Sequence, residues 1–181
     1  MPAAVSRALL LAGAVLGVLA IGARAAGIWV NLSGSLPIGL YRTTHGPIVR
    51  GSIVVVCLPE SVAAFALERE YLQPGSCPGG VEPLGKTVAA LEGDTVAVRA
   101  DGVWVNGHLL MASRPLIRDS RGRLLPRLVG WGRRLSVREV ALVATRRPGS
   151  FDSRYFGEIN ISLVRAILMA VFPGSAAESC R

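Results

Sequence analysis

The chain has 181 residues, which is enough for one domain of ordinary size and a short additional segment. Its hydrophobic content of 51% is high for a soluble protein, so a membrane segment is the first feature to look for. The formal net charge of +8 leaves nucleic acid, anionic lipid and a solvated arginine-rich surface as open explanations. Three cysteines without zinc-site spacing and two histidines argue against a metal centre, and we expect no cofactor.

The N-terminus carries an uncharged apolar block, residues 8–22, between Arg7 and Arg24. As a helix the block spans roughly 22 Å, whereas a hydrocarbon core is roughly 30 Å thick, so a crossing helix would have to continue through residues 25–30. A cleaved signal peptide is the alternative, because a loose small-residue cleavage pattern follows the block. We favour an uncleaved anchor and assign residues 1–29 to a membrane anchor or signal segment.

A short helix is predicted between two cysteines. The β-branched residues 53–58 predict a buried strand, and residues 60–72 predict a helix. A disulfide between Cys57 and Cys77 would close a loop of about 20 residues, stabilise the fold by about 3 kcal/mol and require an oxidising compartment. Two unrelated buried thiols remain the alternative, because spacing alone does not determine pairing. We expect Cys180 to be unpaired.

The following segment is typical of a β-meander. Its Asp101-Gly102 and Asn106-Gly107 pairs are strong hairpin signals, because both accept positive φ. The predicted strands cover residues 87–90, 95–100, 103–105 and 108–111.

Residues 113–138 interrupt this pattern with arginines among glycine, proline and leucine, which predicts an irregular basic excursion from the sheet. Contact with lipid headgroups and a plain solvated loop both stay open for this excursion. Residues 140–145 predict a further strand. The apolar face of residues 163–171 predicts a packed C-terminal helix that is too short to be a second membrane span.

Ser35 and Lys86 are the candidate catalytic residues. Lys86 is the one lysine among 20 basic side chains, and an arginine cannot release its proton in a protein whereas a desolvated lysine can. The mostly apolar neighbours of Lys86 should lower its pKa, so that a neutral amine could accept the proton of the Ser35 hydroxyl. The alternatives are a solvent-facing Lys86, and His45 or His108 as the base, although both histidines lie in or beside turns.

Three ordered motifs resemble the conserved boxes of type I signal peptidases. They are Ser33-Gly34-Ser35 followed by Pro37, Gly85-Lys86-Thr87-Val88 followed by Gly93-Asp94, and Ser150-Phe151-Asp152-Ser153-Arg154-Tyr155-Phe156-Gly157. The short form of the first motif and the Cys57/Cys77 insertion look more like the conjugative-transfer branch, the TraF-type pilin-processing peptidases. The resemblance covers residues from about 30 to 172.

The resemblance implies a mainly β, signal-peptidase-like catalytic domain over residues 30–181, with one N-terminal transmembrane helix and a short helical insertion. It also implies a single-pass protein of the bacterial inner membrane, with its catalytic domain in the periplasm. Its expected partners are membrane lipid and an exported or membrane-embedded pilin-like precursor, which it would cleave after small residues. The product could be hydrolysed or cyclised.

The family pattern also implies a role for each motif residue. Ser35 matches the nucleophile and Lys86 the general base. Ser33 matches the hydroxyl that forms the oxyanion hole with the Ser35 backbone N–H, and Ser150 matches the hydroxyl that orients the lysine amine.

Asp152 and Arg154 match the charged pair that supports the last motif. The sequence departs from the family where Ala144-Thr145-Arg146 replaces a Gly-Asp-Asn, and where Glu92 replaces a proline. Neither departure affects the proposed dyad.

A pilin-maturing peptidase has one close alternative and one from a different functional class. A general signal peptidase differs from it only in the range of its substrates. A basic nucleic-acid-binding accessory of DNA transfer is less favoured, because the arginines lack interleaved aromatic residues. The substrate, the fate of the product and the oligomeric state are left open by the sequence.

Overall fold

The computed structural model describes residues 2–173 except residue 127, so Cys180 lies outside the described residues. The predicted mainly β domain with a short helical insertion is confirmed. The helices are α1 (Pro2–Ala25), α2 (Glu60–Glu68) and α3 (Ser153–Phe156), with one 3-10 turn, η1 (Ile161–Leu163). The strands are β1 (Ile28–Asn31), β2 (Gly39–Thr44), β3 (Ile53–Val56), β4 (Leu84–Ala90), β5 (Thr95–Val98), β6 (Val103–Val105), β7 (His108–Leu109), β8 (Gly132–Arg134), β9 (Glu139–Leu142), β10 (Ile159–Asn160) and β11 (Val164–Pro173).

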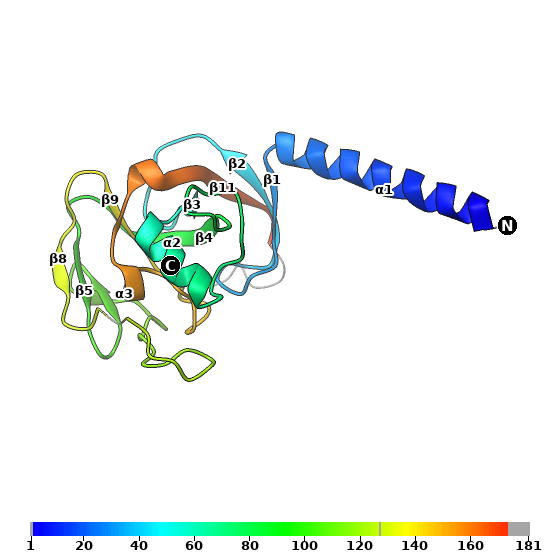
Figure 1. The fold of residues 1–181 in the computed structure, drawn as a ribbon. Coiled ribbons are helices and arrows are strands. Elements are labelled where there is room, and N and C mark those ends of the chain that lie inside the picture. The colour runs from blue at the N-terminus through cyan, green and yellow to red at the C-terminus, as the bar shows by residue number, and fades with distance from the viewer. Residues whose placement is uncertain (1, 127, 174–181) are drawn as a thin grey trace.

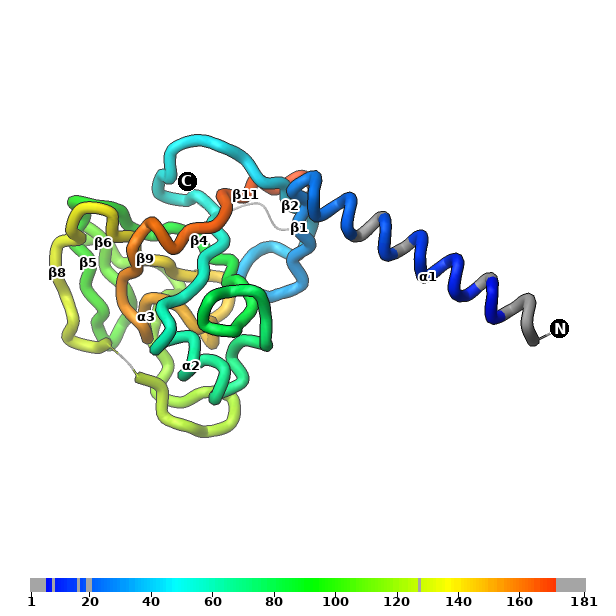
Figure 2. Tube along the Cα trace, turned by 45° about the horizontal axis from the view of Figure 1, so that its top comes forward, coloured from blue at the N-terminus to red at the C-terminus, as the bar shows by residue number. Residues whose placement is uncertain are grey.

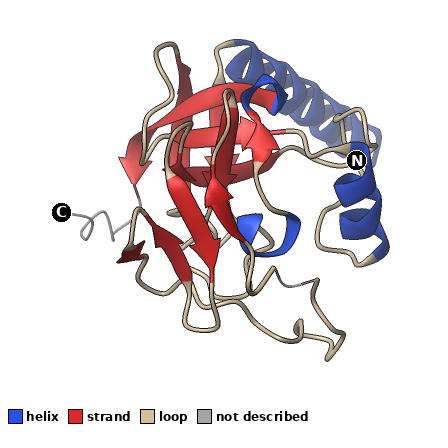
Figure 3. Cartoon of the chain, turned by 90° about the vertical axis from the view of Figure 1, so that its left-hand side faces the viewer, coloured by secondary structure: helices blue, strands red, loops and turns tan. Residues whose placement is uncertain are grey.

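The strands form two antiparallel sheets. The larger has the order β1-β2-β11-β3-β4-β9-β10, and the smaller has the order β7-β6-β5-β8. Figure 3 shows the strands in the body of the domain, and Figures 1 and 2 show α1 projecting away from it. The predicted meander is confirmed only for β5, β6 and β7, because β4 pairs instead with β3 and β9 in the larger sheet. Asn106 and Gly107 have the positive φ angles of 51° and 81° that their turn requires.

Helix α1 carries large apolar side chains that are exposed along its length, including Leu9, Leu10, Leu11, Val15, Val18 and Ile21. Within the described residues, no helix combines the length and the apolar character that a membrane crossing requires. The continuation through residues 25–30 that a crossing helix would require is not formed, because α1 ends at Ala25. The chain turns at Gly27, whose φ is 71°, and β1 then pairs with β2, so strand pairing ends the helix.

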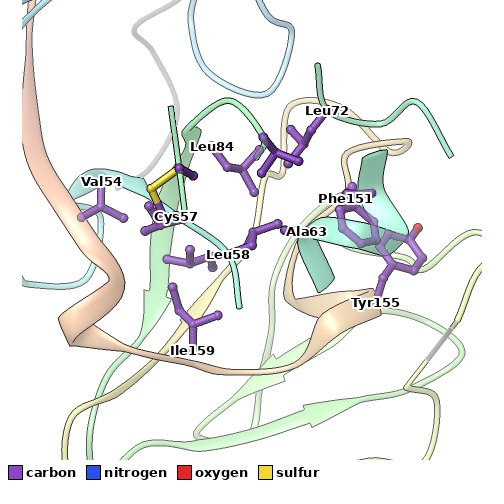
Figure 4. Packing of buried hydrophobic residues seen from close by; sticks show 14 of the residues in the cluster. Val54, Cys57, Leu58, Ala63, Leu72, Leu84, Phe151, Tyr155 and Ile159 are labelled. Atoms are coloured by element: carbon purple, nitrogen blue, oxygen red, sulfur yellow. A yellow bond between two sulfur atoms is a disulfide. The ribbon is translucent and has the colours of Figure 1, made fainter. Parts of the chain in front are cut away.

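The largest hydrophobic cluster joins β3, β4 and β9 to α2 and α3. Figure 4 shows Ala63 of α2 between Leu58 and the aromatic rings of Phe151 and Tyr155. The predicted disulfide between Cys57 and Cys77 is present within this cluster. It ties the end of β3 to the segment that follows α2, so the helical insertion is attached at both ends.

Two predictions of secondary structure are wrong in the second half of the chain. Residues 163–171 do not form a helix, because β11 lies in the larger sheet and pairs with β2 on one side and β3 on the other. These neighbours satisfy its backbone groups along most of its length, and such tertiary pairing overrides local helix propensity. The basic excursion, residues 113–138, is mostly irregular, but it contains β8, which pairs with β5.

Asp152 and Arg154 form an ion pair at α3, and both side chains are fully buried. The guanidinium donates to both carboxylate oxygens, from Nε to Oδ1 at 2.8 Å and from Nη2 to Oδ2 at 2.7 Å. Asp152 also accepts the backbone N–H of Ala144, which continues from β9. The pair therefore fixes the start of α3 against the larger sheet.

We expect removal of the disulfide to lower the free energy of unfolding by about 3 kcal/mol, because the loop of about 20 residues is then free in the unfolded chain. The measurement is guanidinium denaturation of the Cys57→Ala/Cys77→Ala variant and of the wild type, as full chains in a mild detergent. Cys180→Ala is the matched control and should leave the midpoint unchanged. An unchanged midpoint in the double variant would contradict the expected role of the disulfide.

We expect Arg154→Ala to lower the free energy of unfolding by about 3 to 5 kcal/mol, because it leaves the buried Asp152 carboxylate without its counter-charge. Adding Asp152→Ala to that variant should restore part of the loss, since no unpaired charge then remains buried. Arg121→Ala is the control, because it removes an ion pair whose two side chains are more than half exposed. Equal destabilisation by Arg154→Ala and Arg121→Ala would overturn this account.

Candidate active site

Ser35 lies on the loop between β1 and β2, and the side chain of Asn31 holds this loop together. The Asn31 amide donates to the backbone oxygens of Ser33, Leu36 and Pro37 at 3.0, 3.2 and 3.0 Å. Asn31 Oδ1 accepts the Ser33 backbone N–H at 3.2 Å. The loop therefore has a defined shape, and Ser35 is only 9% exposed.

Asn31 received no role in the sequence-based prediction. The sequence does contain a signal for this role. An asparagine two residues before a Ser-Gly pair typically hydrogen-bonds the backbone of the residues that follow it.

Lys86 occupies the middle of β4, which lies between β3 and β9 in the larger sheet. Burial alternates along β4, and Leu84, Lys86, Val88 and Ala90 share its buried face. The lysine is 2% exposed, and its Nζ donates to Ser35 Oγ at 2.8 Å. The structure thus brings together the two residues predicted as nucleophile and base.

The surroundings of Lys86 favour its neutral form. Burial lowers the pKa of the amine from 10.5 to about 8, because desolvation penalises the charged form. The Asp152 carboxylate opposes this change by raising the pKa, and the guanidinium groups of Arg154 and Arg147 add to it by lowering the pKa. A substantial fraction of the amine is therefore neutral near pH 8.

Ser150 comes from a third segment of the chain and contacts the hydroxyl of Ser35. Its Oγ lies 3.0 Å from Ser35 Oγ, and its side chain is buried. Its carbonyl accepts a hydrogen bond from Arg154 Nη2, so the buried ion pair also positions this serine. We expected Ser150 to orient the lysine amine, whereas here its hydroxyl contacts the Ser35 hydroxyl.

Ser33 lies on the same loop as Ser35 but is exposed. Its hydroxyl donates to Asn31 Oδ1 at 2.8 Å. To serve as an oxyanion donor, this hydroxyl has to turn from Asn31 toward the substrate.

A cavity of about 1050 Å³ contains Ser33, Ser35, Lys86 and Ser150 in its lining. Its far wall combines the segment after α2 with the basic excursion. These two regions are linked by the ion pair of Arg121 and Glu70 and by the Tyr71 hydroxyl, which donates to Asp119 at 2.7 Å. The wall is therefore built from two segments that are far apart in the sequence.

The alternative bases are not part of this arrangement. His45 and His108 do not line the cavity, and His45 lies instead at a smaller hollow beside β11. Across the described residues, no three His, Cys, Asp or Glu side chains gather in a way that could hold a metal ion. The arrangement supports proton transfer from serine to lysine and attack by the serine oxygen.

The chain is similar to known peptidases and conjugation proteins. The family model described as "Signal peptidase, peptidase S26" matches residues 4–172. A plasmid transfer protein TraF of Escherichia coli is 40% identical over 168 residues, which cover 92% of this chain and 94% of that protein. The conjugal transfer protein TraF of Agrobacterium fabrum is 36% identical, over 93% of this chain and 96% of that protein. The crystal structure of a signal peptidase I from Enterococcus faecalis is 18% identical and covers 70% of this chain and all of that one, with a TM-score of 0.39. The family match and these relatives show that the chain belongs to the signal peptidase family, peptidase S26.

Proposed function

We propose that the protein is a serine endopeptidase with a Ser35–Lys86 dyad, which cleaves exported precursor proteins after small residues. The single observation that carries this proposal is the hydrogen bond of 2.8 Å from the Lys86 amine to the Ser35 hydroxyl, at a lysine that is 2% exposed. Membership of the signal peptidase family supports the same reaction class.

The chemistry proceeds in two halves. Neutral Lys86 takes the proton of Ser35 Oγ as that oxygen attacks the carbonyl carbon of the scissile bond. The tetrahedral intermediate then collapses to an acyl-enzyme on Ser35, and the Lys86 ammonium gives its proton to the departing amine. A water molecule releases a linear product, whereas the amino terminus of the same chain would release a cyclic one.

Two features support the substrate preference and the stabilisation of the intermediate. The cavity beside the dyad is lined by Leu36, Val55, Leu84 and Gly85, which favours small apolar side chains before the scissile bond. The Ser35 backbone N–H and the Ser33 hydroxyl would bind the oxyanion. A single donor of this kind typically contributes about 2.7 to 4 kcal/mol to the barrier.

We propose further that the substrate is a pilin-like precursor of conjugation, because the relatives are named as plasmid and conjugal transfer proteins. The disulfide favours the oxidising periplasm for the catalytic domain. We assign attachment to the inner membrane to α1, because this helix projects away from the domain (Figure 2) and carries exposed apolar side chains.

The direct test incubates membranes that contain the protein with candidate pilin precursors and measures the intact mass of the products. Loss of a peptide alone indicates hydrolysis, and loss of a further water indicates cyclisation. A panel of unrelated preproteins distinguishes the general signal peptidase alternative, which would process many of them. Failure to cleave any precursor, by a protein that is folded, would contradict the proposal.

Ser35→Ala and Lys86→Ala should each reduce kcat/KM by about 10⁴-fold, because each removes an essential member of the dyad. Lys86→Arg should be equally inactive, since a guanidinium does not release its proton. Lys86→Met is the matched control for packing, because it keeps most of the apolar stem without the amine. Unchanged circular dichroism would show intact folds, and retained processing by Lys86→Ala would rule out the dyad.

The pH dependence follows from the lowered pKa of Lys86, which is about 8. The active form is the neutral amine, so kcat/KM should rise about tenfold per pH unit well below pH 8 and level off above it. A peptide substrate without ionisable groups near the scissile bond isolates the titration of the enzyme. A profile that is flat from pH 6 to pH 8, or that falls across this range, would exclude Lys86 as the base.

A further inference from the structure

Arg147 lies on the turn that leads from β9 to Ser150. The Ser150 backbone N–H donates to the Arg147 carbonyl at 3.0 Å, which closes this turn. Because Ser150 contacts the Ser35 hydroxyl, the turn links Arg147 closely to the reacting atoms. No role was assigned to Arg147 from the sequence.

The side chain of Arg147 lies against the backbone of the nucleophile loop. A Cβ atom at Gly34 would be 3.3 Å from Arg147 Cδ and 3.8 Å from its Nη1. Gly34 stands between Ser33 and Ser35, so the arginine packs where the loop carries no side chain. Arg147 also lines the same cavity as Ser35 and Lys86. Its cationic group is therefore part of the site.

The charge of Arg147 is not balanced within the domain. In the part of the chain that the structure describes, its guanidinium makes no hydrogen bond or ion pair. The acidic side chains that line the cavity already have partners. Glu70 pairs with Arg121, Asp119 pairs with Arg123, and Glu82 accepts the backbone N–H of Gln73.

We propose that Arg147 binds a carboxylate of the substrate close to the scissile bond. This proposal rests on the peptidase function proposed above and names a specificity determinant of the same site. A planar guanidinium matches a carboxylate through two parallel hydrogen bonds, and its exposure leaves both donors accessible to a ligand. The carboxylate comes either from a chain terminus a few residues beyond the cleaved bond or from an acidic side chain of the substrate.

Three alanine-rich peptides, each with a fluorophore and a quencher, test the proposal on the full chain in detergent. The first ends in a free carboxylate three residues beyond the cleaved bond, and the second is its amide. The third is an amide with one glutamate in that segment. The wild type should cleave at least one carboxylate peptide with a kcat/KM about tenfold above that of the plain amide.

Arg147→Ala should bring this ratio to about one, and Arg147→Lys should leave an intermediate value, since lysine keeps the charge without the fork. The ratio compares two peptides on one enzyme, so a change in the titration of Lys86 affects both rates equally. Arg118→Ala is the matched control, because Arg118 lines the same cavity but donates to the Gly122 carbonyl on the far wall. It should keep the wild-type ratio.

The outcomes distinguish a terminal carboxylate from an acidic side chain, and they distinguish the carboxylate site from the peptidase function. Preference for the free terminus identifies a terminal carboxylate, and preference for the glutamate peptide identifies an acidic side chain. Equal rates for all three peptides in the wild type overturn the carboxylate site.

Binding of the same peptides to Ser35→Ala, with and without Arg147→Ala, gives a readout that does not need cleavage. Binding that depends on Arg147, in an enzyme whose wild type cleaves nothing, would support the site and reject the peptidase function. Binding without a preference for any carboxylate would reject the site.

Discussion

The burial of one amine is the constraint on which the rest of the site depends. Lys86 is 2% exposed, and its ammonium form is disfavoured because the interior solvates a charge less well than water does. This cost lowers the pKa of the amine into the range where a base is useful. An arginine at the same position would stay charged. The sheet must therefore be stable enough to hold a lysine where its charged form is unfavourable.

Three segments meet at the Ser35–Lys86 dyad, and each is held by a different interaction. Asn31 fixes the Ser35 loop through hydrogen bonds to its backbone. Strand pairing fixes β4, because Lys86 lies opposite Val54 of β3 and the later part of β4 pairs with β9. The buried Asp152–Arg154 pair fixes the start of α3 and the carbonyl of Ser150. These hydrogen bonds, strand pairings and ion pair share no side chain. The geometry of the dyad therefore does not depend on any one flexible loop.

The same charged pair also acts on the dyad electrostatically. The Asp152 carboxylate raises the pKa of Lys86, while Arg154 lowers it. An isolated buried aspartate would therefore stabilise the ammonium form and weaken the base. Pairing with Arg154 offsets part of that field, and burial remains the largest influence on the pKa of Lys86, so the pair can support Ser150 while the pKa stays lowered.

Local patterns in the sequence were sufficient for the Asn106-Gly107 turn, because it depends on residue chemistry at short spacing. Local patterns left the pairing of Cys57 with Cys77 as one of two alternatives, and they indicated Ser35 and Lys86 as nucleophile and base only together with the resemblance to type I signal peptidases. They were not sufficient for β11, whose alanine, leucine and methionine content favours a helix until β2 and β3 supply hydrogen-bond partners. Strand β1 was missed for a related reason, since its pairing with β2 ends an apolar stretch that otherwise reads as continuous helix. Long-range pairing cannot be read from either segment alone.

The formal charge of +8 gives an incomplete picture of the surface, because several arginines are neutralised by acidic side chains of the same domain. Arg50, Arg121, Arg123, Arg133 and Arg154 all pair with acidic side chains. Two of these pairs, Arg121 with Glu70 and Arg123 with Asp119, stabilise the far wall of the cavity and so neutralise its acidic groups. Glu82, the third acidic residue of the cavity lining, accepts the Gln73 backbone N–H, and within the described residues no ion pair joins an acidic group of the cavity to Arg147. At the active site, the excess positive charge of the chain therefore favours the binding of a negatively charged group.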